Sequence, residues 1–250
     1  MSALHIAAIL VAGVAAGAIN TVVGSGTLIT FPVLLAFGYA PVVANVSNTV
    51  GLVPGSIAGA VGYRQELAGQ ARRALPLAAA SAVGAVAGAV ALLSLPASAF
   101  KAIVPVFIAV ALLLIVLQPA LSRALATHRP RAHGRAGPAA TVGVLGSGVY
   151  GGYFGAAQGI MLLSILGLAL DDDLQRINAL KVVLAGLVNL VAGVIFVIAA
   201  HIAWLPAALI AIGSTVGGAL GAHGGRHLPE WALRLVIVAV GIAAIVKLVA

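Results

Sequence analysis

Two short groups of small and polar residues interrupt apolar stretches of this sequence, and their residue types could bind an anion. The groups consist of Asn20, Gly24, Ser25, Gly26 and Thr27, and of Gly155, Ala156 and Gln158. Because glycine adopts positive φ easily, we expect each apolar helix to unwind there and turn back, leaving backbone amides without helical partners. Such amides, the positive end of the next short helix, and hydroxyl or amide side chains together form an anion site. The alternative is that these side chains only satisfy the backbone broken by glycine.

Further polar residues follow each interruption, in the next apolar segment. They are Asn45, Ser47, Asn48 and Thr49 in the first half, and Asn178 and Lys181 in the second. Polar side chains inside a membrane are costly and are tolerated where they face a partner or a water-filled cavity. We therefore expect Asn48, Thr49 and Asn178 to line a pathway. The alternative is N-capping by Asn45 and Ser47, with hydrogen bonds between helices made by Asn48 and Asn189.

Lys181 is the charged residue expected inside a spanning helix rather than at its end. As a cation near the two interruptions it would compensate the charge of a bound anion. It lies five residues beyond Arg176, only about 7 or 8 Å deeper along a helix, so its side chain could instead extend to the membrane surface. Both interpretations stay open.

Other chemistries lack the residues they need. The chain contains no cysteine and its histidines are scattered, so no disulfide, metal or thiol chemistry is expected. Three consecutive aspartates, 171–173, are expected to cap a helix that starts near Leu174 rather than to hold a metal. Ser25 and Ser147 lack the Gly-x-Ser-x-Gly spacing, and no carboxylate lies in a predicted span to orient a histidine. We expect no enzyme activity and no cofactor.

The composition identifies the class of protein to which these residues belong. With 62% hydrophobic residues, 7% charged residues and a mean hydropathy of +1.20, the chain is too apolar for a soluble domain and is a polytopic membrane protein. No separable signal peptide is expected before the first apolar stretch. The net charge of +8 comes almost entirely from loops between apolar segments, which is typical of cytoplasmic loops rather than of nucleic-acid binding.

The apolar segments fall into two similar sets. They cover about 3–18, 28–37, 42–62, 73–93 and 98–117, and then about 139–150, 160–169, 177–199, 204–222 and 231–249. A span needs about 20 residues, so 28–37 and 160–169 are too short to cross and are expected to be arms of re-entrant hairpins. We predict a first membrane repeat at 1–121, a basic cytoplasmic linker at 122–138 and a second membrane repeat at 139–250, together one integral membrane domain.

Matched residues support this repeat. Gly24 aligns with Gly155 and Ile29 with Ile160 at an offset of 131, and Ser81 aligns with Ser214 at an offset of 133. Paired hydrophobic segments interrupted by glycine are the best sequence pointer to the binding site of a secondary transporter.

Charge indicates how the two halves are oriented. If each hairpin enters and leaves on one side, a repeat crosses three times and the second half is inverted. The following residues are then cytoplasmic: Arg64, Arg72, Arg73, Arg123, Arg129, Arg131, Arg135, Arg176 and Arg226. Lys101 and Lys247 lie outside, which gives the strong bias expected of cytoplasmic loops. In parallel repeats, Arg176 and Arg226 would instead face outward. We therefore predict an all-α fold of two inverted repeats, each a re-entrant or broken helix pair plus three transmembrane helices.

Two stretches resemble the TauE/SafE sulfite exporter family, also called the toluene sulfonate uptake permeases. The first runs from Ala12 to Leu52, AGVAAGAINTVVGSGTLITFPVLLAFGYAPVVANVSNTVGL, and the second is its weaker copy from Gly143 to Lys181. The resemblance covers nearly the whole chain and implies a two-repeat bacterial carrier for sulfite, sulfonates or related organic anions. The sequence departs from the family's double or triple glycine at Gly24-Ser25-Gly26 and Gly155-Ala156-Ala157, which bears on the anion that fits.

We therefore expect a multi-pass protein of the bacterial inner membrane that moves a small sulfur-containing or organic anion, in the direction of export. A passive anion channel and a non-transporting assembly subunit are the alternatives. The expected partners are the anion and membrane lipid but no nucleic acid, and a homo-oligomer stays open.

Overall fold

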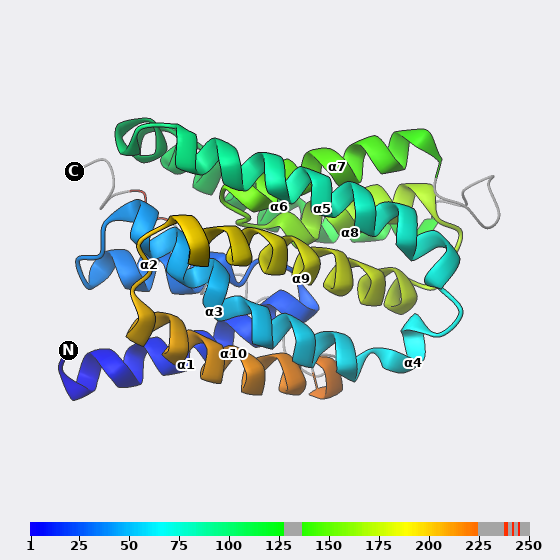
Figure 1. The fold of residues 1–250 in the computed structure, drawn as a ribbon. Coiled ribbons are helices and arrows are strands. Elements are labelled where there is room, and N and C mark those ends of the chain that lie inside the picture. The colour runs from blue at the N-terminus through cyan, green and yellow to red at the C-terminus, as the bar shows by residue number, and fades with distance from the viewer. Residues whose placement is uncertain (128–136, 225–237, 240–241, 243–244, 246–250) are drawn as a thin grey trace.

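The computed structural model describes residues 1–127, 137–224, 238–239, 242 and 245 (Figure 1). Within these ranges the chain forms helices and no strand, so the prediction of an all-α fold is confirmed. The helices are α1 (Ala3–Val22), α2 (Thr27–Ala36), α3 (Pro41–Gly62), α4 (Arg64–Leu67), α5 (Ala71–Ser94), α6 (Ala97–Thr127), α7 (Pro138–Tyr153), α8 (Gln158–Ala169), α9 (Leu174–Ala199) and α10 (Trp204–Gly224).

Five of the described helices are long and apolar enough to cross a membrane. They are α1, α5, α9, α10 and the part of α6 from Ala97 to Ala120. Helix α3 also has 22 residues, but Asn45, Asn48 and their polar neighbours lower its hydropathy. The prediction of a multi-pass membrane protein is confirmed. The predicted span 231–249 and most of the predicted linker 122–138 lie outside the described residues.

Several helix ends differ from the predicted segments. Helix α1 continues to Val22 instead of ending at 18, and α6 continues to Thr127 instead of 117. Helix α9 begins at Leu174, before the apolar segment that starts at 177, because the Asp173 carboxylate accepts a hydrogen bond from the Gln175 amide and caps the helix there. The predicted capping by the aspartates is therefore confirmed. The short helix α4 was not predicted. Apolar composition finds the membrane-buried part of a helix and misses polar turns that extend it.

Helices α1 and α2 form a hairpin whose two ends meet at one end of the molecule. The ring of His5, near the start of α1, lies 4.3 Å from the ring of Phe37, just after α2. The Tyr39 hydroxyl also lies 3.5 Å from the Met1 sulfur. Helix α2 has 10 residues, so it is about 15 Å long and cannot cross a bilayer core of about 30 Å.

Helices α7 and α8 form a second hairpin of the same kind. A Cβ atom added at Gly143, in the first turns of α7, would lie 3.1 Å from Ile165, near the end of α8. The two helices have 16 and 12 residues, too few for either to match the five long spans. Each half of the chain therefore begins with a helix pair whose second helix is too short to cross a membrane.

The two hairpins pack against helices of opposite halves through small residues. In α1, a Cβ atom added at Gly17 would lie 2.3 Å from the Ser214 carbonyl oxygen of α10. In α7, a Cβ atom added at Gly148 would lie 2.7 Å from the Ser81 carbonyl oxygen of α5. These are the residues matched by the sequence repeat, so the same glycine–serine contact is built twice. Without a hydrophobic force between helices in lipid, such close backbone contacts supply the association energy.

Helices α3 and α9 run antiparallel through the middle of the molecule (Figure 1). At one end, the Ser47 hydroxyl accepts a hydrogen bond of 2.9 Å from the Ala203 amide, just beyond the end of α9. Near the other end, Tyr63 packs against Ala179 in the first turns of α9. The polar residues at the start of α3 therefore lie far along the molecule from those at the start of α9.

Candidate functional site

The first interruption is a tight turn between α1 and α2. Gly24 has a φ of +89°, and its amide donates a hydrogen bond of 2.9 Å to the Ile19 carbonyl. Helix α2 then begins at Thr27, with Gly26 as its N-cap and no side chain capping it. The predicted helix break is confirmed, and the amino end of a short buried helix lies beside it.

The second interruption has the same form and carries more backbone strain. Gly155 has a φ of +76°, and Ala157, the N-cap of α8, has a φ of 58°, which a residue with a side chain rarely adopts. The Tyr150 hydroxyl holds this turn with a hydrogen bond of 2.5 Å to the Ala156 carbonyl. Strained backbone of this kind occurs at binding sites, where the surrounding structure imposes it.

The two turns are in direct contact. The Gly159 amide, in the first turn of α8, donates a hydrogen bond of 3.0 Å to the Gly24 carbonyl. A Cβ atom added at Gly24 would lie 2.3 Å from the Gly159 Cα, closer than any side chain allows. The tips of the two hairpins thus meet backbone against backbone, and the amino ends of α2 and α8 are brought together.

Lys181 of α9 lies beside this contact and is fully buried. Its Nζ donates hydrogen bonds of 3.3 Å to the Asn20 carbonyl and 3.1 Å to the Thr21 carbonyl, in the last turn of α1. A lysine at this position complements the negative end of the α1 dipole. The side chain therefore points into the protein, and the alternative that it extends to the membrane surface is wrong.

Asn178 lies one helical turn before Lys181 and reaches one of the same two carbonyls. Its Nδ2 donates to the Thr21 carbonyl at 3.4 Å, and its Oδ1 is buried without a hydrogen-bond partner in the described part of the protein. The Ser25 hydroxyl, in the first turn, is likewise buried and unpartnered there. Buried polar atoms in proteins nearly always have a partner, so such groups point to a ligand or water.

The polar residues of α3 hold the first hairpin. The Asn48 Nδ2 donates to the Thr27 hydroxyl at 3.2 Å, and the Asn48 Oδ1 accepts from the Thr30 hydroxyl. The alternative for Asn48, hydrogen bonding between helices, is confirmed, and its lining of a pathway stays a prediction. The Thr49 hydroxyl donates to the Asn45 carbonyl of its own helix at 3.0 Å.

N-capping by Asn45 and Ser47 is wrong, because α3 already begins at Pro41 with Ala40 as its N-cap. Both residues instead bind other elements from inside the helix. The Asn45 Nδ2 donates to the Tyr153 carbonyl, at the end of α7, at 3.0 Å. Asn45 therefore ties α3 to the second hairpin.

Gln158 is bound within its own hairpin. Its Nε2 donates a hydrogen bond of 3.1 Å to the Ser147 carbonyl, and its amide group would overlap a Cβ atom added at Gly151. Ala156 is fully buried beside it. Of the residues predicted for the site, Asn178 and Lys181 meet the backbone of Asn20 and its neighbour Thr21, next to the Gly24 turn that carries Ser25. Thr27, Asn48 and Thr49 form a second group around α3.

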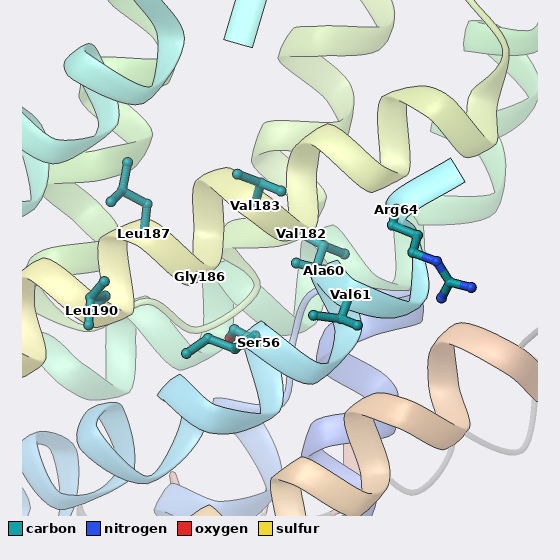
Figure 2. Close-up of a pocket in the computed structure, with 10 residues that line it drawn as sticks. Ser56, Ala60, Val61, Arg64, Val182, Val183, Gly186, Leu187 and Leu190 are labelled. Carbon is teal, nitrogen blue, oxygen red and sulfur yellow. The ribbon is translucent and has the colours of Figure 1, made fainter. Parts of the chain in front are cut away.

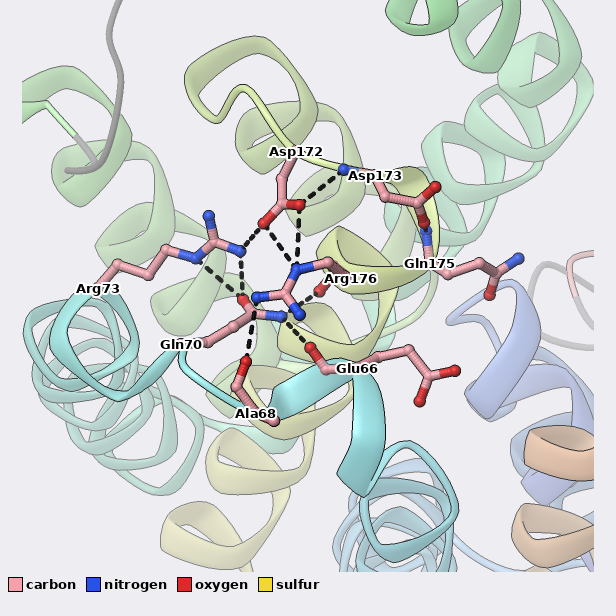
Figure 3. A network of polar contacts seen from close by, with 8 residues as sticks. All are labelled: Glu66, Ala68, Gln70, Arg73, Asp172, Asp173, Gln175 and Arg176. Carbon is pink, nitrogen blue, oxygen red and sulfur yellow. Dashed lines mark hydrogen bonds and ion pairs between the residues drawn. The ribbon is translucent and has the colours of Figure 1, made fainter.

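Charged residues outside the hairpins form a separate network at one end of the molecule (Figure 3). Asp172 pairs with Arg73, and with Arg176 at 3.1 Å. Burial alone would raise the pKa of Asp172, but hydrogen bonds from Arg73, the Asp173 amide and Arg176 outweigh it and lower that pKa. The Gln70 side chain joins in by donating to the Arg176 carbonyl at 3.0 Å. Nothing in the sequence signalled the contacts of Arg73 with Asp172 and of Gln70 with Arg176, because these partners lie about a hundred residues apart.

Comparisons with known proteins agree with this architecture. The sulfite exporter TauE/SafE family matches residues 9–248. The chain is 27% identical over 252 residues to a probable membrane transporter protein, ORF9, of Sinorhizobium sp, covering 99% of this chain and 94% of that protein. It is 24% identical over 209 residues to the probable membrane transporter protein YfcA of Escherichia coli K12, covering 83% of this chain and 76% of that protein. No solved structure matches the chain. Because the family match runs through both hairpins and nearly the whole sequence, this chain belongs to the TauE/SafE sulfite exporter family.

Proposed function

We propose that this membrane transporter carries small anions of the sulfite or sulfonate type across the bacterial inner membrane, and that it binds them where the two hairpin tips meet. The observation that carries the proposal is the combination of buried Lys181 with the unpartnered Ser25 hydroxyl beside two interrupted helices. An anion there would meet one positive charge, a hydroxyl donor and the positive ends of α2 and α8.

The residues of the proposed site have two roles. Ser25 and Lys181 contact the anion, and the Gly24 and Gly155 turns supply backbone amides, while the Asn178 side chain holds the Thr21 carbonyl beside Lys181. Asn20, Gly26, Ala156 and Gln158 shape the turns, while Thr27, Asn48 and Thr49 hold α2 against α3. Neither metal nor cofactor is part of this proposal.

We also propose that the two halves are inverted repeats. Helices α3 and α9 occupy matching positions in the halves, with Gly55 aligned to Gly186, and they run antiparallel. Arg176 lies beside Ala68 and Asp172 beside Arg73, which brings the basic residues of both halves to one end. Parallel repeats would place Arg176 at the opposite end. The positive-inside rule then makes this end cytoplasmic.

Export needs no coupling ion in this arrangement. An anion that leaves an inside-negative cell gains about 2.3 kcal/mol per charge per 100 mV. The acidic proton relay that is common in coupled transporters has no counterpart among the described spans, whose buried polar residues are hydroxyls, amides and Lys181. We therefore propose an export uniporter, with a passive anion channel or a non-transporting assembly subunit as the alternatives.

Anion binding to the purified protein tests the proposed site. Sulfite, sulfate, taurine and sulfoacetate are titrated against wild type and the Ser25→Ala variant. Ser81→Ala is the matched control, because its hydroxyl is also buried and unpartnered but lies on α5. We expect Ser25→Ala to weaken binding at least about tenfold, since a hydrogen bond to a charged group contributes roughly 1.5 to 3 kcal/mol. Equal affinity in the two variants would exclude Ser25 from the site.

A further inference from the structure

An apolar groove runs between α3 and α9 on the outer surface of the protein. Its volume is about 440 Å³, and it is lined from α3 by Ser56, Ala60 and Val61 and from α9 by residues such as Val183 and Leu187 (Figure 2). The groove exists because small residues lie where the helices approach, and a Cβ atom added at Gly186 would lie only 2.9 Å from the Ser56 Cβ. The Ser56 hydroxyl donates a hydrogen bond to the Leu52 carbonyl of its own helix, so the surface of the groove is almost wholly apolar.

One positive charge stands at the end of this groove. Arg64 also lines it, directly after α3, and its side chain is exposed (Figure 2). In contrast with the side chains of Arg73 and Arg176, the Arg64 guanidinium makes no hydrogen bond or ion pair with any residue that the structure describes. A guanidinium group without a partner, beside an apolar surface, suits a phosphate whose ester carries a hydrocarbon chain.

The length of the groove fits one leaflet of a bilayer. From Ser56 to its end at Gly62, α3 rises about 9 Å at about 1.5 Å per residue, and Arg64 follows two residues later. Half of the hydrocarbon core is about 15 Å thick, so an acyl chain in the groove would place its headgroup near Arg64. A second groove of about 310 Å³ continues along the same two helices past Pro54 and Gly193, and no charged residue lines it.

We propose that the groove beside Arg64 binds an anionic phospholipid, with one acyl chain between α3 and α9 and the phosphate on Arg64. A second copy of this chain fits less well, because each copy carries a net charge of +8 and adds repulsion rather than a counter-charge. The uncharged second groove gives no preference for lipid headgroups. We therefore expect the protein to select anionic headgroups only in the leaflet that faces Arg64.

Native mass spectrometry of the purified protein with phosphatidylglycerol or phosphatidylcholine of identical acyl chains tests this site. We expect tighter binding of phosphatidylglycerol by wild type. Arg64→Gln should lower that affinity about fivefold, toward the phosphatidylcholine value, because one arginine near a membrane surface contributes about that factor. Arg72→Gln is the matched control, since Arg72 is also exposed at this end but does not line the groove. Equal loss in both variants, or none in Arg64→Gln, would overturn the proposal.

A groove-filling variant separates lipid from a second protein copy. Ala60→Phe should reduce binding of both lipids and leave the oligomeric state unchanged, whereas Val83→Phe, on an exposed part of α5, should leave lipid binding unchanged. If Ala60→Phe instead shifts the protein between dimer and monomer and lipid binding stays the same, the groove is an interface between copies. The Arg64→Gln result decides the question if Ala60→Phe does not fold.

Discussion

Lys181 shows how a single buried charge can be kept inside a membrane protein. A lysine away from water is costly unless it is paired and hydrogen-bonded. Here its Nζ meets the Asn20 and Thr21 carbonyls at the carboxyl end of α1, and no carboxylate in the described residues pairs with it. Carbonyl dipoles offset only part of a full positive charge. The remaining attraction is available to an anion.

The charge of Lys181 should therefore control anion affinity. Lys181→Gln should weaken binding between about 5-fold and 150-fold, which corresponds to roughly 1 to 3 kcal/mol for a charged partner. Lys181→Arg keeps the charge in another shape and should retain part of the affinity. Titrations on variants that elute as folded protein check this order. Lys101→Gln, which removes an exposed lysine of α6, is the control, and unchanged affinity in Lys181→Gln would move the site onto the backbone turns alone.

The glycines of the two turns should differ in their tolerance of a side chain. Gly24→Ala combines a left-handed φ with a contact of 2.3 Å to the Gly159 backbone, so we expect transport to fall more than tenfold. Gly155→Ala meets only the Gly151 carbonyl oxygen at 3.1 Å, so its cost is the backbone strain of about 1 to 2 kcal/mol, and transport should fall less. Vesicle flux, normalised to the amount of inserted protein, measures both.

Gly38→Ala is the control for this pair, because Gly38 has a φ of +87° but no atom within 4 Å of an added Cβ. The Gly38→Ala variant therefore measures the cost of backbone strain alone, at a position away from the hairpin tips. Normal transport by Gly24→Ala would show that the contact between the turns is not needed. The larger Leu substitution at Gly24 or Gly155 should abolish transport while the protein stays in the membrane.

At the scale of elements, the sequence was most informative where local chemistry decides the structure. The glycines near Gly24 and Gly155 predicted both helix interruptions, because backbone freedom is a local property. The short apolar segments predicted α2 and α8, because segment length is also local. N-capping of α3 by Asn45 and Ser47 was wrong, because Pro41 begins the helix without a capping side chain. The partners of Asn45 and Lys181 lie over a hundred residues away, and no local pattern encodes such contacts.

The loop between α8 and α9 is held by charge, and its stability should depend on pH. Because the pKa of Asp172 is lowered from its ordinary 3.8, its stabilising effect is complete above that value and is lost as pH falls through the lower folded pKa. Asp172→Asn should lower the free energy of unfolding by about 1 to 2 kcal/mol at neutral pH. Thermal unfolding in detergent should show this difference at pH 7 and a shrinking one below pH 3.8. A difference that persists at lower pH would assign the effect to packing.

At the scale of the whole molecule, the two halves are interlocked rather than side by side. Helix α1 packs on α10 and α7 packs on α5, so each hairpin is held by the other half. The Gly17–Ser214 and Gly148–Ser81 contacts repeat the same geometry. Neither half could bury its hairpin alone, and the anion site at the tips requires both.

Inverted repeats make a prediction about topology. Both termini should lie outside the cell and the loop at 122–138 inside, because the arginines of α4, α5 and α9 gather at one end of the molecule. A reporter that is active only in the cytoplasm, fused to either terminus, should be silent, and the same reporter inserted in the loop should be active. An active terminal fusion would contradict the arrangement.

Anion flux through the purified protein in vesicles tests the central claim most directly. Vesicles are loaded with sulfite, and a potassium gradient sets the inside negative. We predict saturable efflux that rises with the potential, by about 2.3 kcal/mol of driving force per charge per 100 mV, and that falls sharply in Gly24→Ala. Saturation and counterflow distinguish a carrier from a channel. Efflux no faster than from protein-free vesicles, for sulfite, taurine and sulfoacetate alike, would contradict anion transport at the hairpin tips.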